Sequence, residues 1–162
     1  MIELRQAYDQ LEMVNELFRE YAVQIHVNLC FQNFEEELAS LPGKYALPKG
    51  RIVVAYVDGI AAGCVALRPF DDHTCEMKRL YVKESFRNMK LGKALARHII
   101  AEAKTIGYDT MVLDTLRSME SALGLYKSLG FVEIQAYYEN PLEGVVYLSL
   151  NLNEVQSDSI EC

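Results

Sequence analysis

The chain has 162 residues, of which 51% are hydrophobic and 24% charged, and its formal net charge at pH 7 is −7. This composition is typical of one globular domain, and the acidic charge argues against non-specific binding of nucleic acid, which needs a basic surface. No apolar run approaches the roughly 20 residues that span a bilayer, and the N-terminus lacks the pattern of a signal peptide. We therefore expect a cytoplasmic domain over residues 1–152, without a membrane or nucleic-acid partner, and a disordered polar tail over 153–162.

Cysteine and histidine spacing gives no sign of a metal site. The four cysteines lie far apart, and no CxxC or CxxH pair is present. Cys64 and Cys75 fall within apolar segments, so we expect buried thiols at these positions rather than metal ligands or a disulfide.

The first half of the chain carries the signals of a strand, two helices and three further strands. Asp9 with Glu12, and Asn33 with Glu36, are residue pairs that typically open helices. Asp58-Gly59 between two apolar runs is a strong hairpin signal. The predicted elements are a strand over 2–5, helices over 9–25 and 33–41, and strands over 52–57, 60–67 and 74–82.

The second half alternates helices with strands. Apolar residues from Leu91 to Ile106 keep helical spacing, with basic residues opposite, and Gly107 is placed to end that helix. The predicted elements are helices over 91–106 and 118–129, strands over 109–115, 131–134 and 146–152, and a polar aromatic loop over 137–144. A helix between two strands implies a right-handed crossover and local parallel pairing. We therefore predict an α/β (α+β) fold, with a mixed, mostly antiparallel sheet and helices on both of its faces.

The segment that enters the central helix is a candidate anion site. Its sequence is Arg87-Asn88-Met89-Lys90-Leu91-Gly92. A helix N-terminus presents unpaired N–H groups and a partial positive charge, which suit a phosphate when basic side chains lie nearby. The segment lacks the first glycine and the hydroxyl of a Walker loop, and it is not a GxGxxG fingerprint. The alternative is a basic surface turn that caps the helix.

This segment resembles the acyl-CoA pyrophosphate loop of the GNAT superfamily of N-acetyltransferases, Q/R-x-x-G-x-G/A, with Arg87 first and Gly92 last. Lys90 stands where the first glycine usually lies, so it either adopts the positive φ that glycine permits or supplies charge instead. Residues 125–131, Leu-Tyr-Lys-Ser-Leu-Gly-Phe, are similar to the family's Y-x-x-x-G-F signature, and residues 76–82 to its central strand. The resemblance covers residues 1–152 and implies a GNAT-type sheet of about seven strands flanked by about four helices.

The resemblance implies acetyl-CoA as acyl donor and a primary amine of a small molecule, amino acid or peptide as acceptor. The amine would attack directly in a ternary complex, without a metal or an acyl-enzyme. Glu76 stands where several members carry the base that takes the amine proton; its alternative role is an ion-pair partner of Lys78 or Arg79. Tyr126 matches the family's usual acid, since a phenol with a pKa of about 10 stays protonated; its alternative role is ordinary packing.

The resemblance also implies cofactor contacts along the central strand and the loop. Backbone groups of Leu80 and Val82 would pair with the pantetheine amides like an added strand, in a slot opened by splaying of the neighbouring strand. The N–H groups of residues 88–93 would hold the pyrophosphate. The predicted cofactor-binding residues are Leu80, Tyr81, Val82, Arg87, Asn88, Met89, Lys90, Leu91, Gly92, Lys93, Thr115, Ser118 and Lys127.

The acceptor site is the least determined part. The run Glu35-Glu36-Glu37 would favour a cationic amine, or it is simply a solvated helix face. Arg68 and Arg79 would instead bind a carboxylate through paired hydrogen bonds, which suggests an amino acid or a peptide terminus. The candidate acceptor residues are Phe31, Phe34, Glu35, Arg68, Arg79, Tyr137 and Tyr138.

Two other functions stay open at this point. A non-catalytic acyl-CoA-binding or regulatory module with the same fold is favoured by Lys90 and disfavoured by the presence of both Glu76 and Tyr126. A nucleotide-binding half-Rossmann domain is disfavoured by the missing GxGxxG motif. The resemblance also makes a homodimer a possible partner arrangement, because relatives often pair through their late strands.

Overall fold

A computed structural model of the protein describes residues 1–25, 33–140 and 142–153. The strands in these ranges are β1 (Ile2–Gln6), β2 (Arg51–Val57), β3 (Ile60–Pro69), β4 (Thr74–Val82), β5 (Thr110–Leu116), β6 (Val132–Ile134) and β7 (Val145–Asn151). Within the described residues they form one seven-stranded sheet in the order β1-β2-β3-β4-β5-β7-β6. Only the β4–β5 pair in this sheet is parallel. The predicted mixed, mostly antiparallel sheet is confirmed.

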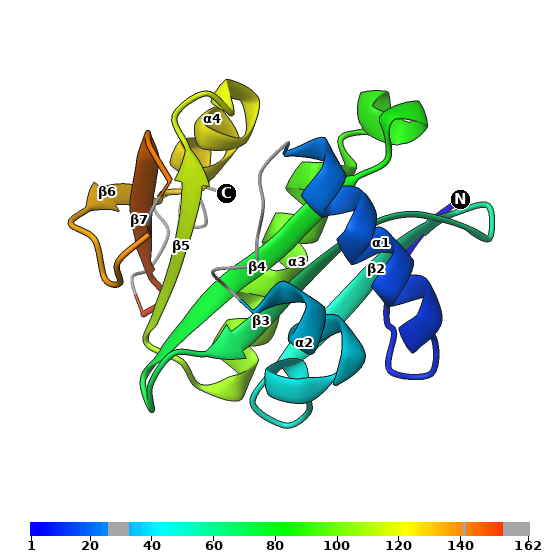
Figure 1. The fold of residues 1–162 in the computed structure, drawn as a ribbon, viewed down its shortest axis with the longest axis horizontal. Coiled ribbons are helices and arrows are strands. Elements are labelled where there is room, and N and C mark those ends of the chain that lie inside the picture. Colours follow the sequence, from blue (N-terminus) through cyan, green and yellow to red (C-terminus); the bar gives the residue numbers. More distant parts are fainter. Residues whose placement is uncertain (26–32, 141, 154–162) are drawn as a thin grey trace, which may run out of the picture.

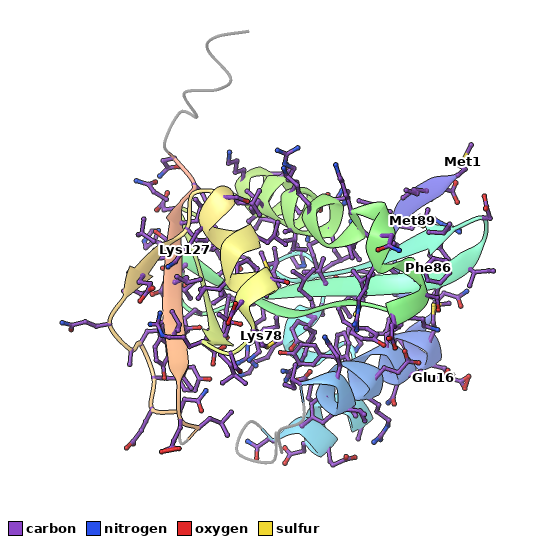
Figure 2. The ribbon with its side chains drawn as sticks, turned by 90° about the horizontal axis from the view of Figure 1, so that it is seen from above. Met1, Glu16, Lys78, Phe86, Met89 and Lys127 are labelled. Carbon is purple, nitrogen blue, oxygen red and sulfur yellow. The ribbon has the colours of Figure 1, made fainter. Side chains whose placement is uncertain are left out.

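Helices cover both faces of the sheet. In the same ranges these are α1 (Leu11–Gln24), α2 (Phe34–Ala39), α3 (Leu91–Ile106) and α4 (Glu120–Ser128), with 3₁₀ helices η2 (Gly43–Tyr45) and η3 (Glu84–Met89). Figure 2 shows α3 on one side of the sheet and α1 on the other. Each side has its own apolar core, one beneath α3 and α4 and one beneath α1 and α2. None of the helices in the described ranges is long and apolar enough to cross a membrane.

The helices begin later than the capping signals predicted. Gln10 precedes α1 and Met119 precedes α4, and neither helix has a side-chain cap. Ser118 therefore caps no helix. Asn33 does precede α2, but its backbone is left-handed, with φ 56°, and its side chain makes no capping hydrogen bond. The first turns are instead closed by backbone bonds alone, such as that from the Leu123 N–H to the Met119 carbonyl oxygen at 3.0 Å.

The parallel pair at the centre of the sheet is short. β4 and β5 are in register at three positions, where Thr74, Cys75 and Glu76 face residues 110–112. Figure 1 shows the two strands side by side at this end and separating toward the other. β4 keeps β3 as its partner, and β5 keeps β7. Within the described residues, the edge of β4 beyond Glu76 that faces β5 therefore has no strand partner. The predicted splay is confirmed.

A β-bulge in β4 lies within the separated part. Cys64 of β3 pairs with Tyr81, and Ala66 pairs with Lys78, so β4 has one residue more than β3 between these pairs. Arg79, inside the bulge, has φ 63°, which is uncommon for a residue other than glycine. The Cys64 thiol donates to the Arg79 carbonyl oxygen at 3.3 Å. A bulge bends its strand and leaves one residue outside the ladder, and here it lies where the strands part.

Both cysteines that were predicted to be buried thiols are free and buried. Cys64 lies in the core beneath α1 and α2, and Cys75 lies in the core beneath α3 and α4. Cys30 and Cys162 lie outside the described residues, as does the tail over 154–162. The helix ends agree better with the sequence than the helix starts do, because Gly107 follows α3 with φ 110°.

A substitution at Gly63 of β3 tests how closely β3 approaches β4. A Cβ atom at this position would lie 2.5 Å from the Tyr81 carbonyl oxygen and 3.2 Å from the Val82 Cα. Backbone atoms cannot rotate aside, so Gly63→Ala is expected to lower the free energy of unfolding by about 1–3 kcal/mol, the usual cost of overpacking. Urea denaturation measures this change.

Gly124→Ala in α4 is the matched control. An added Cβ there meets no atom within 4 Å. Since alanine is the better helix former, this variant is expected to be neutral or to gain up to about 1 kcal/mol. A Gly63→Ala variant as stable as the wild type would contradict the close approach of the two strands.

Candidate active site

A narrow cavity of about 90 Å³ lies between the separated strands, and we call it the slot. Its lining includes Lys78 and Leu80 of β4, Asp114 and Thr115 of β5, and Tyr126 of α4. The loop after β6 adds Asn140. The slot therefore collects side chains from both central strands and from α4 at the point where the sheet opens.

Tyr126 presents a protonated phenol to the slot. Its ring is buried and packs edge-on against Phe131, with 5.8 Å between the ring centroids. Burial raises the pKa of Tyr126, and the neighbouring Tyr21 and Asp114 raise it further, so the phenol stays protonated at neutral pH. Its hydroxyl has no hydrogen-bond partner among the described residues. A protonated hydroxyl on a buried, packed ring therefore faces the slot.

A larger hollow of about 520 Å³ lies beside the slot, and we call it the groove. Leu80, Met119 and Ala122 line both hollows, so the two lie next to each other. Of the predicted cofactor-binding residues, those that line the groove are Leu80, Tyr81, Val82, Arg87, Gly92 and Ser118. The groove thus runs from the unpaired edge of β4 to the start of α3.

The loop before α3 resolves the two alternatives for Lys90. Lys90 adopts the left-handed conformation, with φ 59° and ψ 30°, and stands at the N-cap of α3. The N–H groups of Leu91, Gly92 and Lys93 begin the helix and have no carbonyl partner within it. Arg87 lies beside them, and its Nε donates to the Val82 carbonyl oxygen at 3.1 Å. These donors suit an anionic group such as a diphosphate.

The remaining predicted cofactor residues lie at varying distance from this loop. Asn88, Met89 and Lys93 are exposed beside it, in η3 and the first turn of α3. Thr115 lines the slot instead, with its hydroxyl 3.9 Å from the Met119 Sδ. Lys127 is not brought to the groove, because its ammonium pairs with Glu133 at 3.0 Å. Figure 2 places Lys127 well away from Met89.

A third hollow of about 350 Å³ lies next to the slot, and we call it the recess. Its lining residues are Lys44, Arg68, Pro69, Phe70, Glu76, Lys78, Tyr137 and Tyr138. Lys78 also lines the slot, so it marks the place where recess and slot meet. Three of the predicted acceptor residues, Arg68, Tyr137 and Tyr138, are thus found together in one hollow, beside the predicted base.

Glu76 is the buried carboxylate of the recess. It is 3% exposed, and it accepts hydrogen bonds from the Tyr137 hydroxyl at 2.6 Å and from the Arg68 Nε at 3.0 Å. The Lys78 Nζ lies 4.0 Å away. Glu76 therefore forms ion pairs, as one of the alternatives from the sequence proposed. Its partners are Lys78, which was expected, and Arg68, which takes the role expected of Arg79.

The charges around Glu76 set its ionisation. Burial acts to raise the pKa of Glu76, but the cations Lys78 and Arg68 and the hydrogen bond from Tyr137 outweigh it, and the net pKa is below the usual 4.5. Burial lowers the pKa of Lys78 to about 8, against the opposing pull of Glu76. At neutral pH Glu76 is therefore a carboxylate held by cations, which makes it a weak base.

Arg79 and Glu35 have other partners than those expected. The Arg79 side chain is 1% exposed, and it binds both carboxylate oxygens of Glu37, at 3.1 and 2.9 Å. Its guanidinium also lies over the rings of Tyr21 and Phe34. Arg79 thus ties α2 to β4, and its expected grip on an acceptor carboxylate is not supported. Glu35 is exposed and pairs with Arg19 at 3.3 Å, and Phe31 lies outside the described residues.

Tyr137 and Tyr138, in the segment that follows β6, form one wall of the recess. The Tyr138 hydroxyl donates to Asp114, and the Asn140 Nδ2 donates to the same carboxylate at 3.0 Å. Tyr137 packs edge-on against Phe70, with 5.2 Å between ring centroids. Neighbouring residues of the loop therefore bind a carboxylate of β4 and a carboxylate of β5.

Sequence reasoning did not assign a role to Asp114 or Lys44, and it considered Lys78 only as an ion-pair partner of Glu76. Lys78 stands two residues after Glu76, a spacing that puts both side chains on one face of β4 and could have placed it in the site. Lys44 lies in a loop whose sequence has no periodicity to place it. No cluster of three or more His, Cys, Asp or Glu side chains suited to a metal ion occurs among the described residues.

Lys90 gives a test of the loop geometry. Lys90→Val is expected to lower the free energy of unfolding by about 1–2 kcal/mol, because a β-branched side chain is strained at positive φ. Lys90→Gly is expected to keep wild-type stability, since glycine adopts this conformation readily. Urea denaturation without cofactor measures both. Lys93→Val, in the first turn of α3, is the control and should cost less than about 1 kcal/mol; equal losses at 90 and 93 would refute the strain.

Glu76→Gln gives a test of the buried ion pair. Because the folded pKa of Glu76 lies below 4.5, the carboxylate stabilises the fold at neutral pH, and this contribution is lost as the pH falls through the folded pKa. The variant is expected to lose on the order of 3 kcal/mol at neutral pH, and the loss should shrink below pH 4.5. Melting temperatures across pH measure it, with Glu35→Gln as the exposed control. A loss independent of pH would contradict the assigned ionisation.

Comparison with known proteins agrees with this geometry. The profile of the Acetyltransferase (GNAT) family matches residues 11–131. An uncharacterized N-acetyltransferase of Schizosaccharomyces pombe is 43% identical over 155 residues, which cover 94% of this chain and 93% of that protein. An uncharacterized N-acetyltransferase of Dictyostelium discoideum is 34% identical, over 94% of this chain and 99% of that protein. The N-acetylaspartate synthetase of Mus musculus is 34% identical over 67% of this chain and 37% of its own length.

Solved structures show the same fold. A GNAT-family acetyltransferase of Staphylococcus aureus Mu50 superimposes with a TM-score of 0.76 at 21% identity, over 94% of this chain and 99% of that one. A GNAT-family acetyltransferase of Elizabethkingia anophelis with acetyl-CoA bound has a TM-score of 0.57 at 29% identity, over 68% of this chain and 81% of that one. Given the family match and these relatives, the chain belongs to the GNAT family and is an N-acetyltransferase.

Proposed function

We propose that the enzyme transfers an acetyl group from acetyl-CoA to a primary amine of a small molecule, amino acid or peptide, by direct attack in a ternary complex. One observation carries this proposal: the slot borders both the groove and the recess. Leu80 lines slot and groove, and Lys78 lines slot and recess. Donor and acceptor can therefore reach Tyr126 from different directions at the same time.

The donor side fits acetyl-CoA. The free edge of β4 offers the backbone of Leu80 and Val82 to the pantetheine amides, as a partner strand would be held. The first N–H groups of α3, with Arg87 beside them, hold the diphosphate. Acetyl-CoA supplies a thioester whose carbonyl carbon accepts the amine. The acetyl-CoA bound in the solved Elizabethkingia anophelis relative supports this cosubstrate.

Proton transfers accompany the acyl transfer. The acceptor is an ammonium ion at neutral pH, so its nitrogen loses one proton before it attacks and a second as it bonds to the acetyl carbon, while the sulfur gains one as the C–S bond breaks. Tyr126, a protonated phenol in the slot, gives its proton to the departing thiolate and regains one from those that the nitrogen releases, and the other released proton leaves to solvent. Glu76 lines the recess, whereas Tyr126 lines the slot, so the two groups lie in different hollows. A water molecule therefore carries the amine proton from the slot to Glu76.

Several observations bear on the breadth of the proposal. The name of one relative, N-acetylaspartate synthetase, supports amino acids among the acceptors. The presence of a recess beside the slot disfavours a binding module without activity, because such a module has no use for an acceptor hollow. The cytoplasmic location and the homodimer stay predictions.

Tyr126→Phe tests the proposal most directly. The variant keeps the ring and its packing on Phe131 but loses the proton, so kcat is expected to fall by about 10²-fold or more while the Kd for acetyl-CoA changes little. Thiol release with a panel of primary amines measures turnover, and a thermal shift measures binding. Turnover equal to the wild type would remove Tyr126 as the acid.

Tyr108→Phe is the matched control, because it removes another buried phenol outside the site. The Tyr108 hydroxyl donates to the Lys49 carbonyl oxygen at 2.8 Å. This variant is expected to lose some stability and to keep its kcat. If acetyl-CoA stabilises the wild type but no CoA thiol is released in the presence of any amine of the panel, the non-catalytic alternative is favoured instead.

A further inference from the structure

The recess is positively charged in a protein that is acidic overall. Among its described lining residues are the cations Lys44, Arg68 and Lys78 and one carboxylate, Glu76, a formal excess of two positive charges. The whole chain carries −7. A local charge opposite to that of the molecule favours ligands of the opposite sign at this place.

Arg68 has hydrogen-bonding capacity to spare. Its Nε donates to Glu76 at 3.0 Å, while its two terminal amino groups have no hydrogen-bond partner among the described residues. The Arg68 side chain is 25% exposed, and it lines both the recess and a neighbouring hollow on the side of η2. A guanidinium with its terminal amino groups available is suited to bind a second carboxylate through two parallel hydrogen bonds.

The two lysines lie at different depths. Lys44, in η2, is exposed at the mouth of the recess, and Lys78 is 6% exposed where the recess meets the slot. Figure 2 shows Lys78 in the interior of the molecule, between the two helical layers. A carboxylate bound by Arg68 therefore meets positive charge on both sides, whereas a second ammonium group there would be repelled.

The other wall is aromatic. Phe70 and Tyr137 pack edge-on beside Pro69, and the Tyr137 hydroxyl is already used by Glu76. This wall suits the apolar stem of a small molecule rather than a further charge. We infer that the acceptor is an amine that carries a carboxylate on the same small molecule, as an amino acid does, with Arg68 and Lys44 as its specificity-determining residues. This inference rests on the proposed function.

Matched acceptor pairs that differ only by a carboxylate test the inference. L-phenylalanine with 2-phenylethylamine, and L-leucine with 3-methylbutylamine, are offered to the full chain with acetyl-CoA. The member with the additional carboxylate is expected to have a kcat/KM higher by about tenfold or more, since hydrogen bonds to charged groups discriminate by that amount. Arg68→Met is expected to remove most of this preference.

Lys44→Gln is the second variant, because Arg68→Met also removes a partner of Glu76 and can disturb the fold. Lys44 is exposed, and its loss is expected to lower kcat/KM for the carboxylated members by about threefold to tenfold and to lower it less for their partners. Lys104→Gln, on the exposed surface of α3, is the control and should change neither.

Binding without turnover separates the two levels of the proposal. Carboxylated amines should raise the Tm of the CoA-saturated enzyme more than their partners do, and both recess variants should reduce this difference. Acetylation without any preference for a carboxylate would overturn the inference and leave the proposed function standing. Stabilisation by carboxylated amines without any acetylation would support the recess and overturn the proposed function. If carboxylated amines are favoured neither in acetylation nor in the rise of Tm, the inference is overturned.

Discussion

The short parallel ladder between β4 and β5 is the constraint on which the site depends. The two strands share only the register positions from Thr74 to Glu76 on β4, and then each keeps its outer antiparallel partner. Their inner edges are left to face a slot rather than each other. Had the ladder continued, the backbone of Leu80 and Val82 would be used within the sheet, and Tyr126 would have no cavity to line.

Charge is organised around that opening in two different ways. On the groove side, the donors are backbone N–H groups at the start of α3, set in place by the left-handed turn at Lys90. On the recess side, they are side chains, and Glu76 holds Arg68 and Lys78 near each other by partly neutralising them. A buried cation group of this kind needs a carboxylate partner, because unpaired charges are costly to bury.

The sequence was a good guide where local pattern decides structure. Alternation and β-branched runs predicted the strands, and the glycines after α3 and α4 marked the helix ends. The Arg87 to Gly92 segment and the register of Tyr126 located the groove and the phenol of the slot. It was a poor guide where partners far apart in the chain decide. Arg79 is bound by Glu37, 42 residues away, and no local signal near Arg79 predicts this partner.

The loop that follows β6 links the two diverging strands. Its adjacent residues Tyr137 and Tyr138 are hydrogen-bonded to Glu76 of β4 and Asp114 of β5, respectively. Through these two hydrogen bonds the loop connects strands that no longer bond to each other. Any change in the distance between β4 and β5 therefore also moves the aromatic wall of the recess, so the width of the slot and the shape of the recess change together.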